Sequence, residues 1–138
     1  MFDNIGMKIG DIRYLSPREA CSIDELDIVF IDVRADYESI AKRIVAKQIV
    51  YLPGTSIYEE FGMLDKNRGF IIFDAVGIHS KEVAKFLIEK GFEHIASLAG
   101  GIVDWERDGM PMDIDKGELM TGSCMCTLKP KKRFKNNL

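Results

Sequence analysis

Apolar and polar residues follow two different rhythms along the chain. Short continuous runs of β-branched and aromatic residues at 28–31 and 70–73 predict buried strands. The stretch 80–90 instead repeats its apolar residues every three or four positions, which predicts an amphipathic helix. Strands that alternate with helices along a chain are typical of an α/β fold with a mainly parallel sheet.

The same rules predict the remaining elements and their ends. Ser16 is placed to cap a helix, with Pro17 at its first position and Glu19 completing a capping box. Gly91 stands where the long helix needs a left-handed residue. Further strands are expected at 27–31, 48–52 and 94–98, and further helices at 36–42, 55–63 and 101–107. From Met112 onward the periodicity fails, so we expect a domain over 1–112 and a polar, basic extension over 113–138.

Composition and charge narrow the class of protein. The chain has 138 residues, of which 46% are hydrophobic and 30% are charged, so one domain can bury a core without disulfides. The formal net charge of −3 argues against nucleic acid and against an anionic membrane as partners. No apolar run is long enough to span a bilayer, and the start of the chain does not resemble a signal peptide, so we expect a cytoplasmic protein. The basic residues near the end fit a solvated tail: Lys129, Lys131, Lys132, Arg133 and Lys135.

Three motifs occur in a characteristic order. Asp32-Val33-Arg34 follows a predicted strand, and a six-residue loop at 74–79 joins the strand at 70–73 to the helix that opens at Ser80. The third motif is Leu-Ala-Gly-Gly-Ile-Val-Asp-Trp at 98–105, followed by Gly-Met-Pro at 109–111. Together they span about residues 8–113, and in this combination the chain resembles the rhodanese family. The resemblance implies a five-stranded, mostly parallel central sheet with helices on both faces, and a site at the 74–79 loop. We expect no cofactor.

The loop carries the candidate chemistry. It joins the carboxyl end of a strand to the amino end of a helix, where free backbone N–H groups can converge on an anion. The resemblance implies a cysteine at the first loop position, where the amides would stabilise its persulfide. This chain has Asp74 there, which cannot carry a persulfide, and we expect its carboxylate to take the amides for itself. The candidate anion- or substrate-binding residues are Ala75, Val76, Gly77, Ile78, His79 and Ser80, with Asp32 and Arg34 as further residues of the family motif.

Two other features depart from the family pattern. His79 stands where the family often has arginine, and Lys42-Arg43-Ile44 stands where it commonly has Gly-His-Ile. The six-residue length of the loop fits the sulfurtransferases, whereas the related cell-cycle phosphatases have a longer loop. The loop length and Asp74 together argue against phosphatase activity. Asp74 in place of the cysteine also argues against ordinary thiosulfate sulfurtransferase activity.

A pair of cysteines, Cys124 and Cys126, is the second place for chemistry. A Cys-x-Cys pair can form a strained disulfide, hold a soft metal together with other ligands, or carry sulfur on one thiol and resolve it with the other. It can equally be an incidental pair of thiols. Cys21, beside Ala20 in a predicted helix, is expected to be an inert core residue.

Two functions remain open at this stage. The first is a rhodanese-family protein of sulfur or thiol metabolism, inactive at its loop, with a sulfur-carrier or redox role for Cys124 and Cys126. The second is a non-catalytic rhodanese module. Its partner would be a small anion, or a sulfur-carrier or thiol protein. The sequence contains no signal for a particular oligomeric state.

Overall fold

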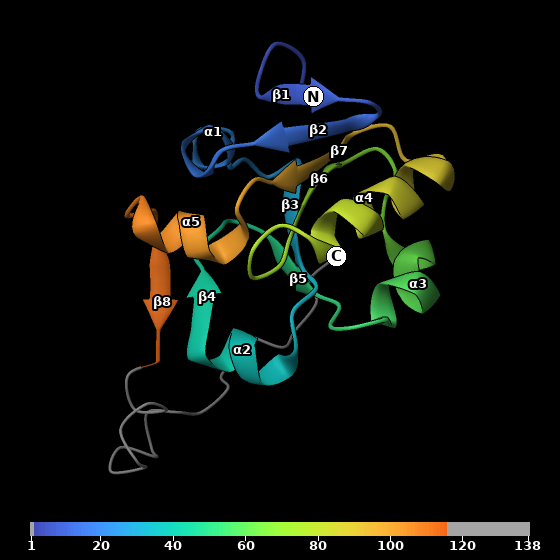
Figure 1. Cartoon of the computed structure of the whole chain (residues 1–138). Coiled ribbons are helices and arrows are strands. Elements are labelled where there is room, and N and C mark those ends of the chain that lie inside the picture. Colours follow the sequence, from blue (N-terminus) through green and yellow to red (C-terminus); the bar gives the residue numbers. More distant parts are fainter. Residues whose placement is uncertain (1, 116–138) are drawn as a thin grey trace.

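A six-stranded sheet forms the centre of the molecule (Figure 1). The computed structural model describes residues 2–115. The strands lie in the order β1-β2-β7-β6-β3-β5, all parallel except β1, which pairs antiparallel with β2. The strands are β1 (Met7–Ile9), β2 (Ile12–Leu15), β3 (Ile28–Asp32), β5 (Ile49–Tyr51), β6 (Gly69–Phe73) and β7 (Ile95–Leu98).

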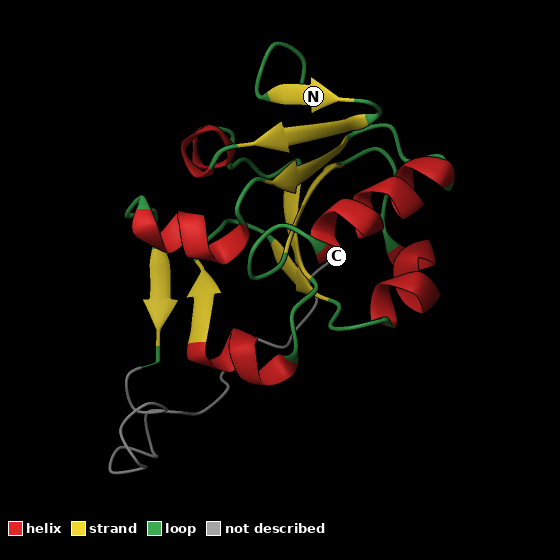
Figure 2. Cartoon of the chain, in the orientation of Figure 1, coloured by secondary structure: helices red, strands yellow, loops and turns green. Residues whose placement is uncertain are grey.

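Helices cover both faces of this sheet, which confirms the expected fold class. Figures 1 and 2 show α1 and α5 on one side of the sheet and α3 and α4 on the other. The helices are α1 (Pro17–Ser22), α2 (Asp36–Ala41), α3 (Ser56–Glu60) with the 3₁₀ turn η1 (Phe61–Met63), α4 (His79–Glu89) and α5 (Gly101–Arg107). The sheet contains the five parallel strands implied by the resemblance and a sixth, antiparallel strand at its edge.

Successive side chains of each central strand lie on opposite faces of the sheet and contribute to two separate hydrophobic cores. In β3, Val29 and Ile31 join the cluster beneath α3 and α4, whereas Phe30 joins the cluster beneath α1 and α5. Successive strand residues point to opposite faces, so a strand covered on both sides must be apolar throughout. Each such side chain that becomes fully buried contributes about 1.5–3 kcal/mol. Because β6 lies between β3 and β7 with all its residues buried, the expectation of a central parallel strand at 70–73 is confirmed.

The helix ends follow their sequence signals with small shifts. The capping box is present, since the Glu19 N–H donates to Ser16 Oγ at 3.2 Å and the Ser16 N–H donates to Glu19 Oε1 at 2.9 Å. The Ser16 N–H also lowers the pKa of the Glu19 carboxyl. Gly91 has φ +95°, as expected after α4. The helix expected at 55–63 divides into α3 and η1, and Thr55 caps it without a side-chain hydrogen bond.

A two-stranded ribbon, which the sequence did not predict, lies outside the main sheet. Strand β4 (Lys42–Ile44) pairs antiparallel with β8 (Met112–Ile114). Regular structure therefore continues to Ile114, two residues beyond the domain end expected at residue 112. The ribbon is too short for periodicity to detect, and its pairing joins segments about seventy residues apart. Arg43 Nη2 and Asp113 Oδ2 form an ion pair at 2.5 Å across it.

Trp105 ties this ribbon to the core. Its side chain is 1% exposed, packs edge-on against Phe30 with ring centroids 5.8 Å apart, and donates from Nε1 to the Pro111 carbonyl at 2.8 Å. Pro111 immediately precedes β8, so this one hydrogen bond joins α5 to the ribbon.

We predict that Trp105→Phe lowers the free energy of unfolding by about 1–3 kcal/mol, through lost packing and the lost hydrogen bond to Pro111. Urea unfolding followed by circular dichroism measures the change, because Trp105 is the sole tryptophan and the variant has no tryptophan fluorescence. The control is Tyr37→Phe, at a residue that is 74% exposed. Equal stability of the two variants would show that the indole does not hold the ribbon.

Candidate active-site loop

The loop between β6 and α4 lies where an open α/β sheet offers a binding site. It leaves the carboxyl end of β6, which is flanked by β7 and β3, and it reaches the amino end of α4. Crevices at this edge, above a central strand, are where such sheets bind ligands. The helix begins at His79, one residue earlier than the sequence suggested. The loop proper is therefore residues 74–78.

Asp74 is the internal ligand of this loop. Its Oδ1 accepts a hydrogen bond from the Gly77 N–H at 2.6 Å, and its Oδ2 accepts one from the His79 N–H at 2.8 Å. The residue is only 7% exposed. Both oxygens are thus engaged by amides at the start of α4, where a negative charge also interacts favourably with the helix dipole.

Gly77 is required by the path of the loop. Its φ of +93° lies in the region that side-chain-bearing residues rarely adopt. A Cβ atom there would lie 3.1 Å from the backbone nitrogen of Gly100. The turn that brings the Gly77 N–H to Asp74 therefore also brings the loop against the segment before α5.

The other side of the loop is held by α5. The Ile102 N–H donates to the Asp74 carbonyl at 3.0 Å, and the Val103 N–H donates to the Ala75 carbonyl at 3.1 Å. A Cβ at Gly101 would come within 2.5 Å of these same two carbonyl oxygens. The loop is thus fixed between the amino ends of two helices, and the free amides of α5 are satisfied by its backbone.

Ser80, one of the expected binding residues, joins helix α4 to the sheet. Ser80 is fully buried, and its Oγ lies 2.9 Å from the equally buried Oγ of Ser97 on β7. Its hydroxyl thus joins α4 to the sheet and does not face a ligand. Sequence reasoning missed Ser97, although a single hydroxyl in an otherwise apolar strand was a usable signal, because a buried hydroxyl needs a partner.

His79 lies across the edge of the loop. Its half-buried ring places Nε2 3.4 Å from the Gly54 carbonyl, and the ring packs edge-on toward Tyr58 with centroids 6.5 Å apart. Burial raises the pKa of the Tyr58 hydroxyl, and the nearby Glu82 carboxylate raises it further. The histidine therefore connects the start of α4 to the turn after β5.

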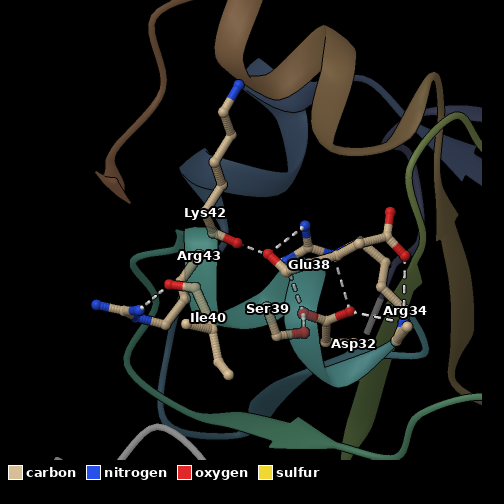
Figure 3. A network of polar contacts seen from close by, with 8 residues as sticks. Asp32, Arg34, Glu38, Ser39, Ile40, Lys42 and Arg43 are labelled. Carbon is tan, nitrogen blue, oxygen red and sulfur yellow. Dashed lines mark hydrogen bonds and ion pairs between the residues drawn. The ribbon is translucent and has the colours of Figure 1, made fainter. Parts of the chain in front are cut away.

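Asp32 and Arg34 form a buried polar network beside the loop, shown in Figure 3. Arg34 donates from Nε to Asp32 Oδ1 at 3.1 Å and from Nη2 to Asp32 Oδ2 at 2.9 Å. The guanidinium also donates to the carbonyl oxygens of Glu38 and Lys42, and Ser39 Oγ donates to Asp32 Oδ2 at 2.8 Å.

This network positions the chain around the loop. Asp32 and Arg34 are 1% and 6% exposed, so neither offers a free charge to a ligand. Arg34 instead joins the end of β3 to α2 and to the start of β4, and its guanidinium lies 5.7 Å from the centre of the Phe73 ring. Phe73 directly precedes Asp74. The network therefore acts on the loop through packing. The sequence patterns did not predict that Glu38, Ser39 and Lys42 bind to Asp32 and Arg34.

The cysteines do not meet this loop within the described part of the chain. Cys21, expected in the core, is only half-buried in α1, where it packs against the core cluster that contains Trp105. Cys124 and Cys126 lie outside residues 2–115. Within that range no group of three or more histidine, cysteine or acidic side chains is placed to hold a metal ion. No helix of the same range is long and apolar enough to cross a membrane.

Comparison with known proteins agrees with this geometry. The model of the rhodanese-like domain family matches residues 20–108. The chain is 31% identical over 105 residues to the putative sulfurtransferase YtwF of Bacillus subtilis, which covers 76% of this chain and 98% of that protein. It is also 31% identical over 94 residues to the thiosulfate sulfurtransferase GlpE of Coxiella burnetii, over 68% of this chain and 86% of the relative. The chain belongs to the rhodanese-like domain family, and its relatives associate it with sulfur metabolism.

Solved structures show the same fold. A rhodanese-related protein from Thermoplasma volcanium superimposes with a TM-score of 0.66 at 23% identity, over 75% of this chain and 99% of that one. The polysulfide-sulfur transferase homodimer of Wolinella succinogenes gives a TM-score of 0.67 at 26% identity, over 75% of this chain and 79% of its own. The sheet, its covering helices and the loop at the strand ends thus belong to an established architecture.

We predict that Asp74→Asn destabilises the protein at pH 7 by about 1–3 kcal/mol. The amide keeps one acceptor oxygen but directs an NH₂ group at one of the two backbone donors, which is left unsatisfied. Chemical denaturation measures the loss, with Asp11→Asn as the control at an exposed aspartate. If both variants unfold at the same urea concentration, the two amide hydrogen bonds do not stabilise the loop.

We further predict that Asp32→Asn costs about 3–5 kcal/mol, because it leaves the buried Arg34 guanidinium without its anion. Arg107→Lys, at an ion pair whose arginine side chain is 66% exposed, should change stability by less than about 1 kcal/mol. The two midpoints of thermal or urea unfolding give the comparison. Similar losses in both variants would contradict a specific role for the buried network.

Proposed function

We propose that this rhodanese-family protein acts in sulfur metabolism without using its loop as a sulfur carrier. The observation that supports the proposal is the Asp74 carboxylate, which holds the Gly77 and His79 amides at 2.6 and 2.8 Å. Sulfur transfer at this position needs a thiol that can be converted to a persulfide, and a carboxylate has no such chemistry. The protein is therefore inactive as an ordinary thiosulfate sulfurtransferase at the loop.

The occupied amides also disfavour an external anion. Thiosulfate carries two negative charges and would have to displace, or lie against, a carboxylate that already accepts from the Gly77 and His79 amides. Arg34, the nearest buried cation in the family motif, is neutralised by Asp32. The Asp74 carboxylate and the Arg34 guanidinium thus both interact with groups of the chain itself, which supports a structural role for the loop.

In this proposal, sulfur chemistry falls to Cys124 and Cys126. Their thiols lie close in sequence to Lys129, Lys131 and Lys132, whose charges favour the thiolate form. One thiolate attacks the outer sulfur of a donor such as thiosulfate, the sulfur–sulfur bond of the donor breaks, and sulfite leaves with the electron pair. The resulting persulfide passes its terminal sulfur to an acceptor thiol, or is attacked at its inner sulfur by the neighbouring cysteine. The second course gives a disulfide and releases hydrosulfide. Reduced thiols of this kind fit a cytoplasmic protein.

A second candidate function is a non-catalytic rhodanese module that binds a protein partner or a small anion. One observation favours a protein partner. Val76 and Ile78, on a loop that needs no external ligand, are 52% and 65% exposed. Large apolar side chains presented on a rigid loop are suited to protein contacts.

We predict that the wild-type protein has negligible thiosulfate:cyanide sulfurtransferase activity at its loop, and that Asp74→Cys gains a persulfide there when incubated with thiosulfate. Thiocyanate formation and intact-protein mass spectrometry with peptide mapping measure the two effects. Wild-type turnover that persists in the Cys124→Ser, Cys126→Ser double variant would refute this account of the loop.

Mass spectrometry of the native protein separates the two candidate functions. A persulfide or disulfide at Cys124 or Cys126 after exposure to a sulfur donor is expected for the sulfur carrier. Stably unmodified thiols would favour the binding module. The matched control is Cys21→Ala, which removes the packing cysteine and should leave the modification unchanged.

A further inference from the structure

A hollow of about 540 Å³ lies at the end of the sheet opposite the 74–78 loop. The loop follows the carboxyl end of β6, whereas the hollow is lined by Ile95, the first residue of the parallel strand β7, and by the connection from α4 to that strand. Lys8 of β1, Arg13 of β2 and Asp11 of the turn between them also line it. Figure 1 shows this turn beside the end of α4. Small-molecule sites in proteins have volumes of about 300–1,000 Å³, so the hollow is large enough for such a ligand.

Buried apolar side chains make up part of the lining. Phe2, Phe92 and Ile95 are 4%, 3% and 5% exposed. Phe92 is held by an edge-on contact with Phe70 of β6, with ring centroids 5.9 Å apart. These side chains belong to the two cores, so they give the hollow a fixed apolar wall. Charges beside such a wall are less screened than charges in open solvent.

Six titratable side chains line the same hollow. The basic ones are Lys8, Arg13 and His94, and the acidic ones are Asp3, Asp11 and Glu93. Within residues 2–115 none of the six takes part in an ion pair. The hollow therefore brings together charges of both signs that the described part of the chain does not neutralise.

Two of these cations face each other directly. Lys8 and Arg13 are cross-strand partners in the β1–β2 pair, a position at which like charges repel. Arg13 is half-buried, and its Nη1 donates to the Ile5 carbonyl at 2.7 Å, which holds the guanidinium in place. An anionic group bound between the two side chains would relieve their repulsion.

We propose that this hollow is a second binding site, which takes a zwitterionic ligand of the size of an amino acid or a short peptide. The carboxylate of the ligand binds between Lys8 and Arg13. Its ammonium group lies toward Glu93, which follows the end of α4, where the helix dipole also favours a positive charge. Its apolar part packs on Phe92 and Ile95. A ligand with only one sign of charge would leave the opposite set of side chains uncompensated, which is why the site favours a ligand that carries both.

A titration with leucine and two truncated analogues tests this assignment. The first analogue, 4-methylpentanoate, lacks the amino group, and the second, 3-methylbutylamine, lacks the carboxylate. Nuclear magnetic resonance of the ¹⁵N-labelled full chain follows the backbone amides of Phe92 and Ile95. We expect saturable shifts with leucine and severalfold weaker binding of each analogue. The absence of saturable shifts with leucine, or equal affinity for leucine and 4-methylpentanoate, would overturn the proposal.

Charge-neutralising variants then assign the two ends of the ligand. Lys8→Gln and Glu93→Gln should each weaken leucine binding severalfold, and both residues are exposed, so the fold should persist. Lys8→Gln should narrow the preference for leucine over 3-methylbutylamine, and Glu93→Gln should narrow the preference over 4-methylpentanoate. The matched control is Lys81→Gln, at an exposed lysine in the first turn of α4, far from the end of that helix which lines the hollow.

If all three variants bind leucine with wild-type affinity, the ligand is not held by these charges and the proposal fails. None of these measurements involves the 74–78 loop or a sulfur donor. A negative result here would therefore leave the proposed function unaffected, and failure to find a persulfide would leave this second site unaffected.

Discussion

The hydrogen bonds from the Gly77 and His79 amides to the Asp74 carboxylate determine what the site can do. They place a fixed negative charge where the fold gathers positive partial charges from the amino ends of two helices. The positive φ of Gly77, the close approach of Gly100 and Gly101, and the start of α4 at His79 all serve this arrangement. A family site that elsewhere presents a sulfur atom is here completed by the chain itself.

The second determinant is the buried pair of Asp32 and Arg34. A charged pair at this depth is tolerated only because its remaining donors and acceptors are used by Ser39 and by the carbonyl oxygens of Glu38 and Lys42. The same guanidinium packs over Phe73, the residue before Asp74. The Asp32–Arg34 pair and Asp74, about forty residues apart in sequence, thus meet at one edge of the sheet, and the buried pair supports the loop.

Sequence patterns predicted the helices and strands that depend on short-range interactions or that are completely buried. Strands β3 and β6, helix α4 and the Ser16 capping box follow from continuous apolar runs, helical spacing and short-range hydrogen bonding. Strands β1, β4 and β8 have three residues each, so alternation cannot be detected, and β4 and β8 depend on pairing between distant segments. At the site, the ligand role of Asp74 followed from its place before a helix. The pairing of Ser80 with Ser97 did not, because it depends on which strand lies beside α4.

The antiparallel edge strand β1 has a consequence for how the molecule behaves among its own copies. An open sheet edge offers unpaired backbone groups on which another chain could polymerise. Here that edge is only three residues long, carries Lys8 at its centre, and is bounded by Gly6 and Gly10 in left-handed conformation. An incoming strand would find few consecutive partners and would have to desolvate an ammonium group. The short hairpin thus disfavours the addition of another chain at this edge of the sheet, whose inner strands are highly apolar.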